Sequence, residues 1–396
     1  MKEKRLRVLV VDDTVVYRKI VSDLLSELPY VEVVGTANNG KIAMSKIATL
    51  KPDILTLDIE MPEMNGLDVL ERMKIESPEV GAIVLSTLTH KGGELTMKAL
   101  DLGAFDFITK PQADTMEENL NEIKKAIGPM LQAFSRRQEI KSILSGRSRF
   151  LEEEPKKGLL RTSDAVVQRM NTITGKTTTR AEIVGIGVST GGPKALSQMM
   201  PQIPRDIDVP ILIVQHMPAI FTQSLAKSLD SKCVIEVREA VDGEPVFPNR
   251  ALIAPGGRQM KVVASTDGVT RIIRITDDPP ENSCKPSVDY LLRSIAHHYV
   301  GRSAGVIMTG MGSDGTLGLQ LMKRNGSTII AQNEETCVVY GMPKKPIEEG
   351  IVDIIAPLER IAEEIYHAAK GTAFHACTGE KGSGQEKRQL GNGTNQ

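Results

Sequence analysis

The chain has 396 residues and a mass of 43.1 kDa, which predicts two or three domains of ordinary size. Hydrophobic residues make up 40% and charged residues 25%, a balance that excludes a collagen, a coiled coil and a wholly disordered chain. The 49 basic and 50 acidic residues leave a net charge of -1, so charge does not favour a nucleic-acid or membrane-surface protein, and the apolar runs fall far short of the ~18 residues that a membrane span needs.

The first part of the chain alternates between short β-branched runs and segments with helical periodicity. The runs predict strands at residues 6–11, 31–36, 54–59, 82–86 and 105–109, and the segments between and after them predict helices at 15–28, 40–50, 66–75, 93–102 and about 120–127. Five such repeats indicate a parallel sheet with helices on both faces. We expect this first domain to occupy residues 1–130.

The composition changes over residues 131–180, which carry charges of both signs and a polar, Thr-rich stretch. This texture predicts a linker with room for one short helix. The chain ends on a polar, Gly-rich segment, residues 371–396, which we expect to be a disordered tail.

A second alternation of strands and helices fills residues 181–370. It predicts strands at 183–188, 210–215, 251–254, 305–309 and 327–331, helices at 195–200, 221–229, 288–297 and 317–324, and a β-hairpin whose arms are 260–264 and 270–275. The predicted fold class is therefore α/β, with two doubly wound parallel-sheet domains: one flavodoxin-like and one Rossmann-like with an added hairpin.

The four cysteines, at positions 233, 284, 337 and 377, are 40 or more residues apart, and none has the CxxC spacing of a metal site. Free thiols in a reducing cytoplasm are the simplest interpretation. The N-terminus begins with basic residues, but its apolar run is short and ends in two aspartates, so we predict no signal peptide.

Five polar residues follow the predicted strands of the first domain: Asp12 and Asp13 after the first, Asp58 at the third, Thr87 after the fourth and Lys110 after the fifth. The carboxyl ends of parallel strands meet at one edge of the sheet, where function collects. Three carboxylates at one edge repel each other unless a cation joins them, and Mg²⁺ suits oxygen ligands. The pattern predicts a phosphoryl-acceptor site; the alternative is ordinary polar residues that cap helices.

A second candidate site follows the strands of the second domain. Ser189 lies in Gly-Val-Ser-Thr-Gly, which fits the G-x-S-x-G turn that exposes a serine between a strand and a helix. A serine nucleophile needs a base, and His216 directly follows an apolar strand; Asp314 follows another and is placed to orient the base. The order Ser, His, Asp differs from that of α/β-hydrolases. Chance and helix capping are the alternatives for each residue taken singly.

Two other functions compete with a hydrolase. Gly310, Gly312 and Gly315 match the dinucleotide-binding pattern G-x-G-x-x-G, with Glu334 or Glu335 about 20 residues further on. This pattern lies late in the domain, however, and the carboxylate at position 314 would face the pyrophosphate. The second competitor, a DNA-binding regulator, predicts a small basic output domain, which a large second α/β domain does not resemble.

Residues 5–127 resemble a response-regulator receiver domain, in the stretches VLVVDDT, TLDIEMPEMNGLDVL, VLSTLT and FDFITKP. The resemblance implies that a partner histidine kinase phosphorylates Asp58. It also implies a Mg²⁺ site formed by Asp12, Asp13 and Asp58 together with the backbone carbonyl of Glu60.

In the same family the residues at Thr87 and Lys110 bind the phosphoryl group. The peptide bond between the lysine and the following proline is commonly cis there, so the resemblance implies a cis bond between Lys110 and Pro111.

The second domain resembles the catalytic domain of chemotaxis protein-glutamate methylesterases, the CheB family, in GIGVSTGGPKAL, VQHMP, APGG, KPSVDYLL, TGMGSDG and AQNEETCVVYGMPKKPI. The resemblance implies that Ser189 is the nucleophile, His216 the base and Asp314 its orienter. Thr190 lies beside the nucleophile, and the backbone N–H of Met311 is the implied oxyanion donor.

A receiver followed by this domain implies a cytoplasmic, phosphorylation-activated hydrolase with chemoreceptors as substrates. It would remove methyl groups from γ-glutamyl methyl esters and deamidate receptor glutamines, with no cofactor for the hydrolytic step and no nucleic-acid or inserted-membrane partner. Two features depart from the family pattern: the long linker and the Gly-rich tail.

Overall fold

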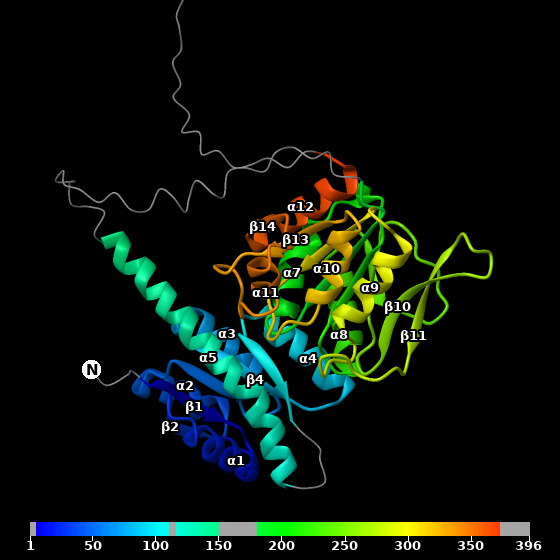
Figure 1. Cartoon of the computed structure of the whole chain (residues 1–396). Helices are drawn as coiled ribbons and strands as arrows, with labels where there is room; N and C mark the ends of the chain where they lie inside the picture. The colour runs from blue at the N-terminus through cyan, green and yellow to red at the C-terminus, as the bar shows by residue number, and fades with distance from the viewer. Residues whose placement is uncertain (1–4, 111–115, 150–179, 373–396) are drawn as a thin grey trace, which may run out of the picture.

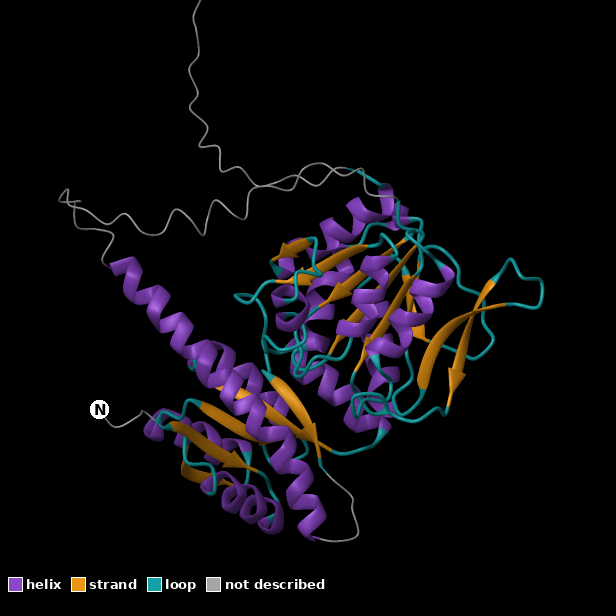
Figure 2. Ribbon diagram, in the orientation of Figure 1, coloured by secondary structure: helices purple, strands orange, loops and turns teal. Residues whose placement is uncertain are grey.

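The computed structural model describes residues 5–110, 116–149 and 180–372, which form two α/β domains (Figure 1). Each domain has one parallel sheet with helices on both faces, as Figure 2 shows, and the predicted fold class is confirmed. No helix in these described ranges is both long and apolar enough to cross a bilayer.

The first sheet has the order β2-β1-β3-β4-β5. Its central strands are buried on both faces because they consist almost entirely of β-branched and aliphatic residues. The elements are β1 (Leu6–Val11), α1 (Val15–Ser26), β2 (Val31–Ala37), α2 (Gly40–Leu50), β3 (Ile54–Asp58), α3 (Gly66–Glu76), β4 (Gly81–Ser86), α4 (His90–Asp101), β5 (Asp106–Thr109) and α5 (Met116–Arg149).

The long helix α5 continues through Pro129 to Arg149, so the first part of the stretch predicted as a linker is helical. Its buried side chains, Ile123, Ile127, Leu131 and Phe134, follow helical spacing and pack on the core of the first domain. Phe134 also packs edge-on against Phe105, with ring centroids 5.2 Å apart. This packing outweighs the helix-breaking signal of Gly128 and Pro129.

The second sheet has the order β14-β13-β12-β6-β7-β9-β8, so β6 lies between β12 and β7 at the switch point where α/β folds bind ligands. The antiparallel hairpin β10–β11 projects from this domain (Figure 1). The elements are β6 (Ile183–Val188), α7 (Gly192–Met199), η2 (Met200–Gln202), η3 (Arg205–Ile207), β7 (Ile211–Gln215), α8 (Ala219–Asp230), β8 (Glu236–Glu239), β9 (Arg250–Ile253), β10 (Gln259–Ala264), β11 (Arg271–Thr276), α9 (Val288–His298), β12 (Ser303–Ile307), α10 (Thr316–Arg324), β13 (Thr328–Gln332), α11 (Lys344–Glu348), β14 (Ile354–Ala356) and α12 (Leu358–Lys370).

Two strands of this sheet, β8 and β14, do not appear among the predicted strands. They are the two edge strands, of four and three residues, and each has exposed positions. Other predictions fall outside the described residues: the rest of the linker at 150–179, the tail from 373, and the peptide bond to Pro111.

Candidate functional site

The turn between β6 and α7 carries Ser189. The Ser189 backbone N–H donates to the Thr309 carbonyl at 3.0 Å, and the Ser189 carbonyl accepts from the N–H of Gly192 at 2.8 Å and from Nε2 of Gln215 at 3.0 Å. The turn is therefore held on both sides while the serine side chain stays partly exposed.

Two glycines of this turn have steric reasons to be glycine. Gly191 has φ +75°, and a Cβ at this position would lie 2.4 Å from Cβ of Val338. A Cβ at Gly192 would lie 2.0 Å from Oε1 of Gln215. The predicted G-x-S-x-G turn is thus a tight strand-to-helix turn that a larger residue would push apart.

Sheet register brings His216 next to the serine. β6 pairs with β7 so that Val188 lies opposite Gln215, which places Ser189 and His216 in successive positions at the carboxyl edge. Nε2 of His216 lies 3.0 Å from Oδ2 of Asp314, which comes from the loop after β12, the strand on the other side of β6. The structure thus brings the three predicted residues together.

The carboxylate of Asp314 is surrounded by hydrogen-bond donors. In addition to His216 it accepts from Oγ of Ser287, from Nδ2 of Asn282 and from the backbone N–H groups of Val288, Asp289 and Gly315. Three of these residues, Ser287 to Asp289, form the N-terminus of α9, where a negative charge is favoured. The side chain is almost fully buried and held in one orientation.

The pairing of His216 with Asp314 shifts the pKa values of both side chains. Burial alone would lower the pKa of His216, but the hydrogen bonds and charges of Asp314 and Cys284 outweigh it and raise the pKa to about 9. Burial would raise the pKa of Asp314, but the hydrogen bond and charge of His216 and the backbone donors lower it to about 2. Asp314 therefore stays a carboxylate over the physiological pH range and stabilises the imidazolium.

The neutral imidazole has one tautomer that fits these contacts. A carboxylate only accepts hydrogen bonds, so Nε2 carries the proton and Nδ1 has the free lone pair. The sulfur of Cys284 lies 3.8 Å from this Nδ1. The nitrogen available to deprotonate a serine is therefore Nδ1.

The loop that carries Met311 packs directly against the nucleophile turn. A Cβ at Gly310 would lie 2.7 Å from Cβ of Ser189, and Met311 follows with an exposed side chain. Oγ1 of Thr309 donates to the Thr190 carbonyl at 2.9 Å, which fixes the two loops to each other. The backbone of Met311 is thus close to the nucleophile turn, where an oxyanion donor is needed.

The same geometry argues against a dinucleotide site at Gly310–Gly315. The backbone N–H of Gly315, the N-cap of α10, donates to Oδ1 of Asp314, so a carboxylate already lies at the helix start where a pyrophosphate would have to bind. Glu334, one of the two candidate ribose ligands, forms an ion pair with Arg136 at 3.1 Å.

The carboxylates of the first domain also meet at one edge. Oxygens of Asp12, Asp13 and Asp58 lie within 4.8 Å of one another. Nζ of Lys110 lies 2.8 Å from Oδ2 of Asp12 and 2.7 Å from Oδ2 of Asp58, and 4.9 Å from the centre of the Tyr17 ring. This is the cluster that the strand ends predicted.

The contacts of the Asp58 carboxylate do not fully offset the cost of burying its negative charge. Burial raises its pKa to about 6, although the charge and hydrogen bond of Lys110 act in the opposite direction and the charges of Asp12 and Asp13 raise it further. Oδ2 of Asp12 is buried beside the Lys110 ammonium and receives no well-oriented hydrogen bond from the described residues. The exposed Asp13, the incompletely neutralised Asp58 and this Asp12 oxygen fit a divalent cation with oxygen ligands.

Two other predicted residues lie around this cluster. Thr87 directly follows β4, and its hydroxyl lies 3.4 Å from the hydroxyl of Thr89. The side chain of Glu60 points to solvent and pairs with Lys91 at 2.8 Å, which leaves the Glu60 carbonyl as the part that a metal could use.

The two domains meet at the nucleophile turn. The backbone N–H of Gly191, two residues after the serine, donates to Oδ2 of Asp106 in β5 at 2.8 Å. The pKa of Asp106 is raised to about 6, mainly because the carboxyl group is buried. Next to it, the rings of Phe107 and Phe221 stack with centroids 4.8 Å apart, and α4 packs against α7 and α8 (Figure 1).

Sequence patterns did not predict the roles of three of these residues. Asp106 contacts the other domain, Asn282 binds Asp314, and Cys284 contacts the base. The one available signal was position: Cys284 directly precedes the KPSVDYLL stretch that carried the resemblance.

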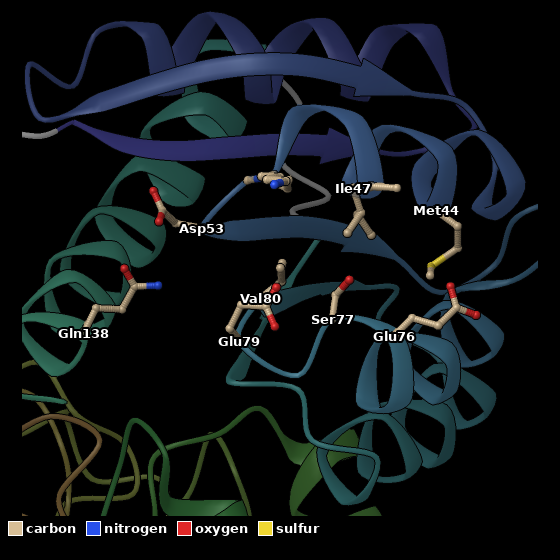
Figure 3. Close-up of a pocket in the computed structure, with 11 residues that line it drawn as sticks. Met44, Ile47, Asp53, Glu76, Ser77, Glu79, Val80 and Gln138 are labelled. Carbon is tan, nitrogen blue, oxygen red and sulfur yellow. The ribbon is translucent and has the colours of Figure 1, made fainter. Parts of the chain in front are cut away.

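A surface hollow of the first domain lies away from both sites (Figure 3). Asp53 and Val80, just before β3 and β4, line it together with Ile47 of α2 and Gln138 of α5. These are the amino ends of the strands, opposite the edge that carries Asp58, so we assign the hollow no role in the site.

Comparisons with known proteins match both domains. The family model described as CheB methylesterase matches residues 184–365, and the response regulator receiver domain model matches residues 8–121. The protein-glutamate methylesterase/protein-glutamine glutaminase of Desulfotalea psychrophila is 54% identical over 374 residues, which cover 93% of this chain and 99% of the relative.

The Bacillus subtilis protein of the same name is 42% identical over 368 residues, which cover 92% of this chain and 99% of the relative. Among solved structures, the Thermotoga maritima CheB methylesterase catalytic domain is 42% identical and covers 48% of this chain and 99% of its own, with a TM-score of 0.46.

Proposed function

Because the chain belongs to the family of protein-glutamate methylesterase/protein-glutamine glutaminase enzymes with a receiver domain, we propose that Ser189, His216 and Asp314 are its catalytic triad and that phosphorylation of Asp58 controls them. The observation that carries the proposal is the 3.0 Å contact between His216 and Asp314 beside the Ser189 turn. We assign the receiver to residues 1–130 and the hydrolase to residues 181–370, which the matches at 8–121 and 184–365 support.

In the first step, Nδ1 of His216 takes the proton of the Ser189 hydroxyl while the serine oxygen attacks the carbonyl carbon of a γ-glutamyl methyl ester. Asp314 stabilises the imidazolium that forms, as its donor-rich, buried position allows. The backbone N–H of Met311 donates to the oxyanion, and one such donor supplies about 3 kcal/mol in serine hydrolases.

In the second step, the imidazolium gives its proton to the leaving methoxide, and methanol departs. Water then attacks the acyl-serine with His216 again as base, which releases glutamate and restores the serine. A glutamine side chain passes through the same tetrahedral geometry and loses ammonia, so one site serves both reactions.

The receiver domain supplies the control. Receiver domains generally bind Mg²⁺ for phosphorylation, and the ion supplies charge neutralisation for the incoming phosphoryl group. Asp12, Asp13 and Asp58, with the Glu60 carbonyl, would hold the ion here. Asp58 accepts the phosphoryl group from a histidine kinase, and Lys110 and Thr87 bind its oxygens.

In the unphosphorylated chain, the receiver restricts the hydrolase through contacts next to the nucleophile turn. Asp106 binds the backbone two residues from Ser189, and the Phe107–Phe221 stack holds β5 against α8. The connection between the domains gives an effective concentration of roughly millimolar, so a weak interface is sufficient. Phosphorylation then needs to change the balance by about 1–3 kcal/mol for a 5- to 150-fold activation.

The substrates in this proposal are the cytoplasmic helices of chemoreceptors, and the phosphodonor is the chemotaxis histidine kinase, so the site of action is the cytoplasmic face of the membrane. The binding partners are proteins rather than nucleic acid, in line with the net charge of -1.

The test measures methanol release from methylated chemoreceptor membranes by wild type and Ser189→Ala, each with and without a small-molecule phosphodonor and Mg²⁺. We expect release by wild type, faster release with phosphodonor, and a loss on the order of 10⁴-fold or more in Ser189→Ala. Equal release by both proteins would exclude Ser189 as the nucleophile, and no release under any condition would exclude this substrate.

A further inference from the structure

The thiol of Cys284 lies against the catalytic base. Its sulfur is 3.8 Å from Nδ1 of His216 and 3.5 Å from the carbonyl oxygen of Asn282. Cys284 is positioned by a tight turn in which its own N–H and carbonyl both bond to Glu281, at 2.7 and 3.1 Å. The side chain is partly exposed, so solutes can reach it.

The separation of these two atoms suits a metal ion between them. A tetrahedral zinc ion with bonds of about 2.3 Å to sulfur and about 2.0–2.1 Å to nitrogen holds the two atoms about 3.6 Å apart. The observed 3.8 Å therefore needs a shift of a few tenths of an ångström in one side chain. Thiolate and imidazole are also the ligand types that zinc prefers.

The other side of the imidazole has the partner that metal-bound histidines usually have. A histidine that binds a metal almost always donates its other ring N–H to a carboxylate, a backbone carbonyl or a water, which fixes the tautomer and the ring orientation. Here Nε2 donates to Asp314 at 3.0 Å. The Asp314 oxygens already accept several other donors, so Asp314 orients the ring rather than binding the ion itself.

We propose that Nδ1 of His216 and Sγ of Cys284 form a binding site for zinc that blocks the hydrolase. Each ion that binds displaces two protons to solvent, the thiol proton of Cys284 and the Nδ1 proton of the His216 imidazolium. It forms one bond to sulfur and one to nitrogen, with water at the remaining positions and no change of oxidation state. The ion occupies the lone pair that removes the proton from Ser189, so binding and hydrolysis exclude each other.

The receiver site does not compete for the same ion. Asp12, Asp13 and Asp58 offer only oxygen atoms, which suit Mg²⁺, whereas the Cys284 site offers sulfur and nitrogen. Millimolar Mg²⁺ should therefore leave the Cys284 site free for zinc.

The experiment titrates the full-length protein with zinc in competition with a chromophoric chelator, in excess Mg²⁺. Cobalt(II) serves as the spectroscopic probe, because a thiolate ligand gives a charge-transfer absorption. Wild type should bind zinc and show this absorption. Cys284→Ser should lose the absorption and bind at least about tenfold more weakly, since losing a ligand costs no less than losing its supporting shell. Cys233→Ser, which removes a thiol elsewhere in the domain, should behave as wild type.

Protection of the wild-type thiol tests the site without a variant. Zinc should slow the alkylation of Cys284, located by peptide mapping, and leave the alkylation of Cys233 unchanged. Equal zinc affinity and cobalt absorption in wild type and Cys284→Ser, or equal alkylation of Cys284 with and without zinc, would overturn the proposal. None of these measurements needs a substrate, so their results do not depend on the proposed esterase function. If that function holds, zinc should also inhibit methanol release, and a chelator should reverse the inhibition.

Discussion

Each domain places a buried carboxylate at the carboxyl edge of a parallel sheet, but the two carboxylates have opposite surroundings. Asp58 faces two other carboxylates and the Lys110 ammonium at 2.7 Å, and burial raises its pKa to about 6. Asp314 accepts hydrogen bonds from a histidine, a hydroxyl, an amide and three backbone N–H groups, which together with the charge of His216 lower its pKa to about 2.

This difference separates two chemical roles on one kind of scaffold. Asp58 has unused acceptor capacity and excess negative charge around it, so it suits a cation and an incoming phosphoryl group. The Asp314 oxygens already accept several hydrogen bonds and the carboxylate stays charged, so Asp314 suits the role of a permanent partner for His216. The number of donors around each carboxylate, rather than the sheet, decides its chemistry.

The largest expected effect comes from Asp314→Asn. The amide cannot stabilise the imidazolium, so we expect the rate of methanol release to fall by about 10⁴-fold with little change in KM. Steady-state kinetics on methylated receptor membranes, with phosphodonor present, measure this.

A matched control is Asp289→Asn, a neighbouring buried carboxylate that binds Gly318 and Asn282 instead of the base. Its loss should be smaller by at least about tenfold, because it acts on the base only through its neighbours. If the two variants lose the same fraction of activity, the assignment of Asp314 as the partner of the base is wrong. The loss of a buried negative charge would then explain both results.

The next prediction concerns pH. The general base must be neutral, and the raised pKa of His216, about 9, keeps it protonated at neutral pH. Methanol release by the unphosphorylated enzyme should therefore rise with pH, about ninefold from pH 7 to 8 and about fivefold from pH 8 to 9, and level off above. A stopped assay across this range, with the Ser189→Ala rate subtracted for uncatalysed ester hydrolysis, gives the profile. A plateau already reached at pH 7 would contradict the pairing with Asp314.

Loosening the interface should activate the enzyme without phosphate. Phe107→Ala removes the ring stack on Phe221, worth roughly 1.4 kcal/mol, so methanol release without phosphodonor should increase about tenfold. Its phosphodonor response should shrink in proportion, because part of the restriction is already gone.

The companion variant is Asp58→Asn, which keeps the interface and removes the acceptor oxygen. It should keep the unstimulated rate and lose the response to phosphodonor. An unstimulated rate in Phe107→Ala equal to that of wild type would show that the β5 contact does not restrict the hydrolase.

Sequence patterns predicted the interior of both sheets because interior strands have a strong signal. β1, β3, β6 and β7 are buried on both faces and consist of near-continuous β-branched and aliphatic residues. The edge strands β8 and β14 are short and partly exposed, so their composition resembles that of loops. The continuation of α5 past Pro129 depended on side chains that pack on the receiver core, which local helix signals do not contain.

The residues of the candidate sites also divide into those that the sequence predicted and those that it did not. Ser189, His216 and Asp314 could be predicted because each directly follows a strand of one sheet, and strand ends converge. Cys284 reaches His216 from a turn whose residues Asn282 and Ser283 have φ of 51° and 62°, a path that no spacing rule describes. The contact of Asp106 with Gly191 depends on how two domains dock, and each domain's own pattern says nothing about that.

The smallest expected effect concerns the periphery of the same interface. Arg136 of α5 pairs with Glu334 of the second domain at 3.1 Å, and both side chains are largely exposed. Exposed pairs contribute roughly 0.2–1 kcal/mol, so Arg136→Ala should raise the unstimulated methanol release by less than about fivefold. The gain should disappear in high salt, which screens the pair in wild type as well. A gain as large as that of Phe107→Ala would place the restraint in the long helix rather than at β5, and the comparison of the two variants therefore locates the contact that phosphorylation has to break.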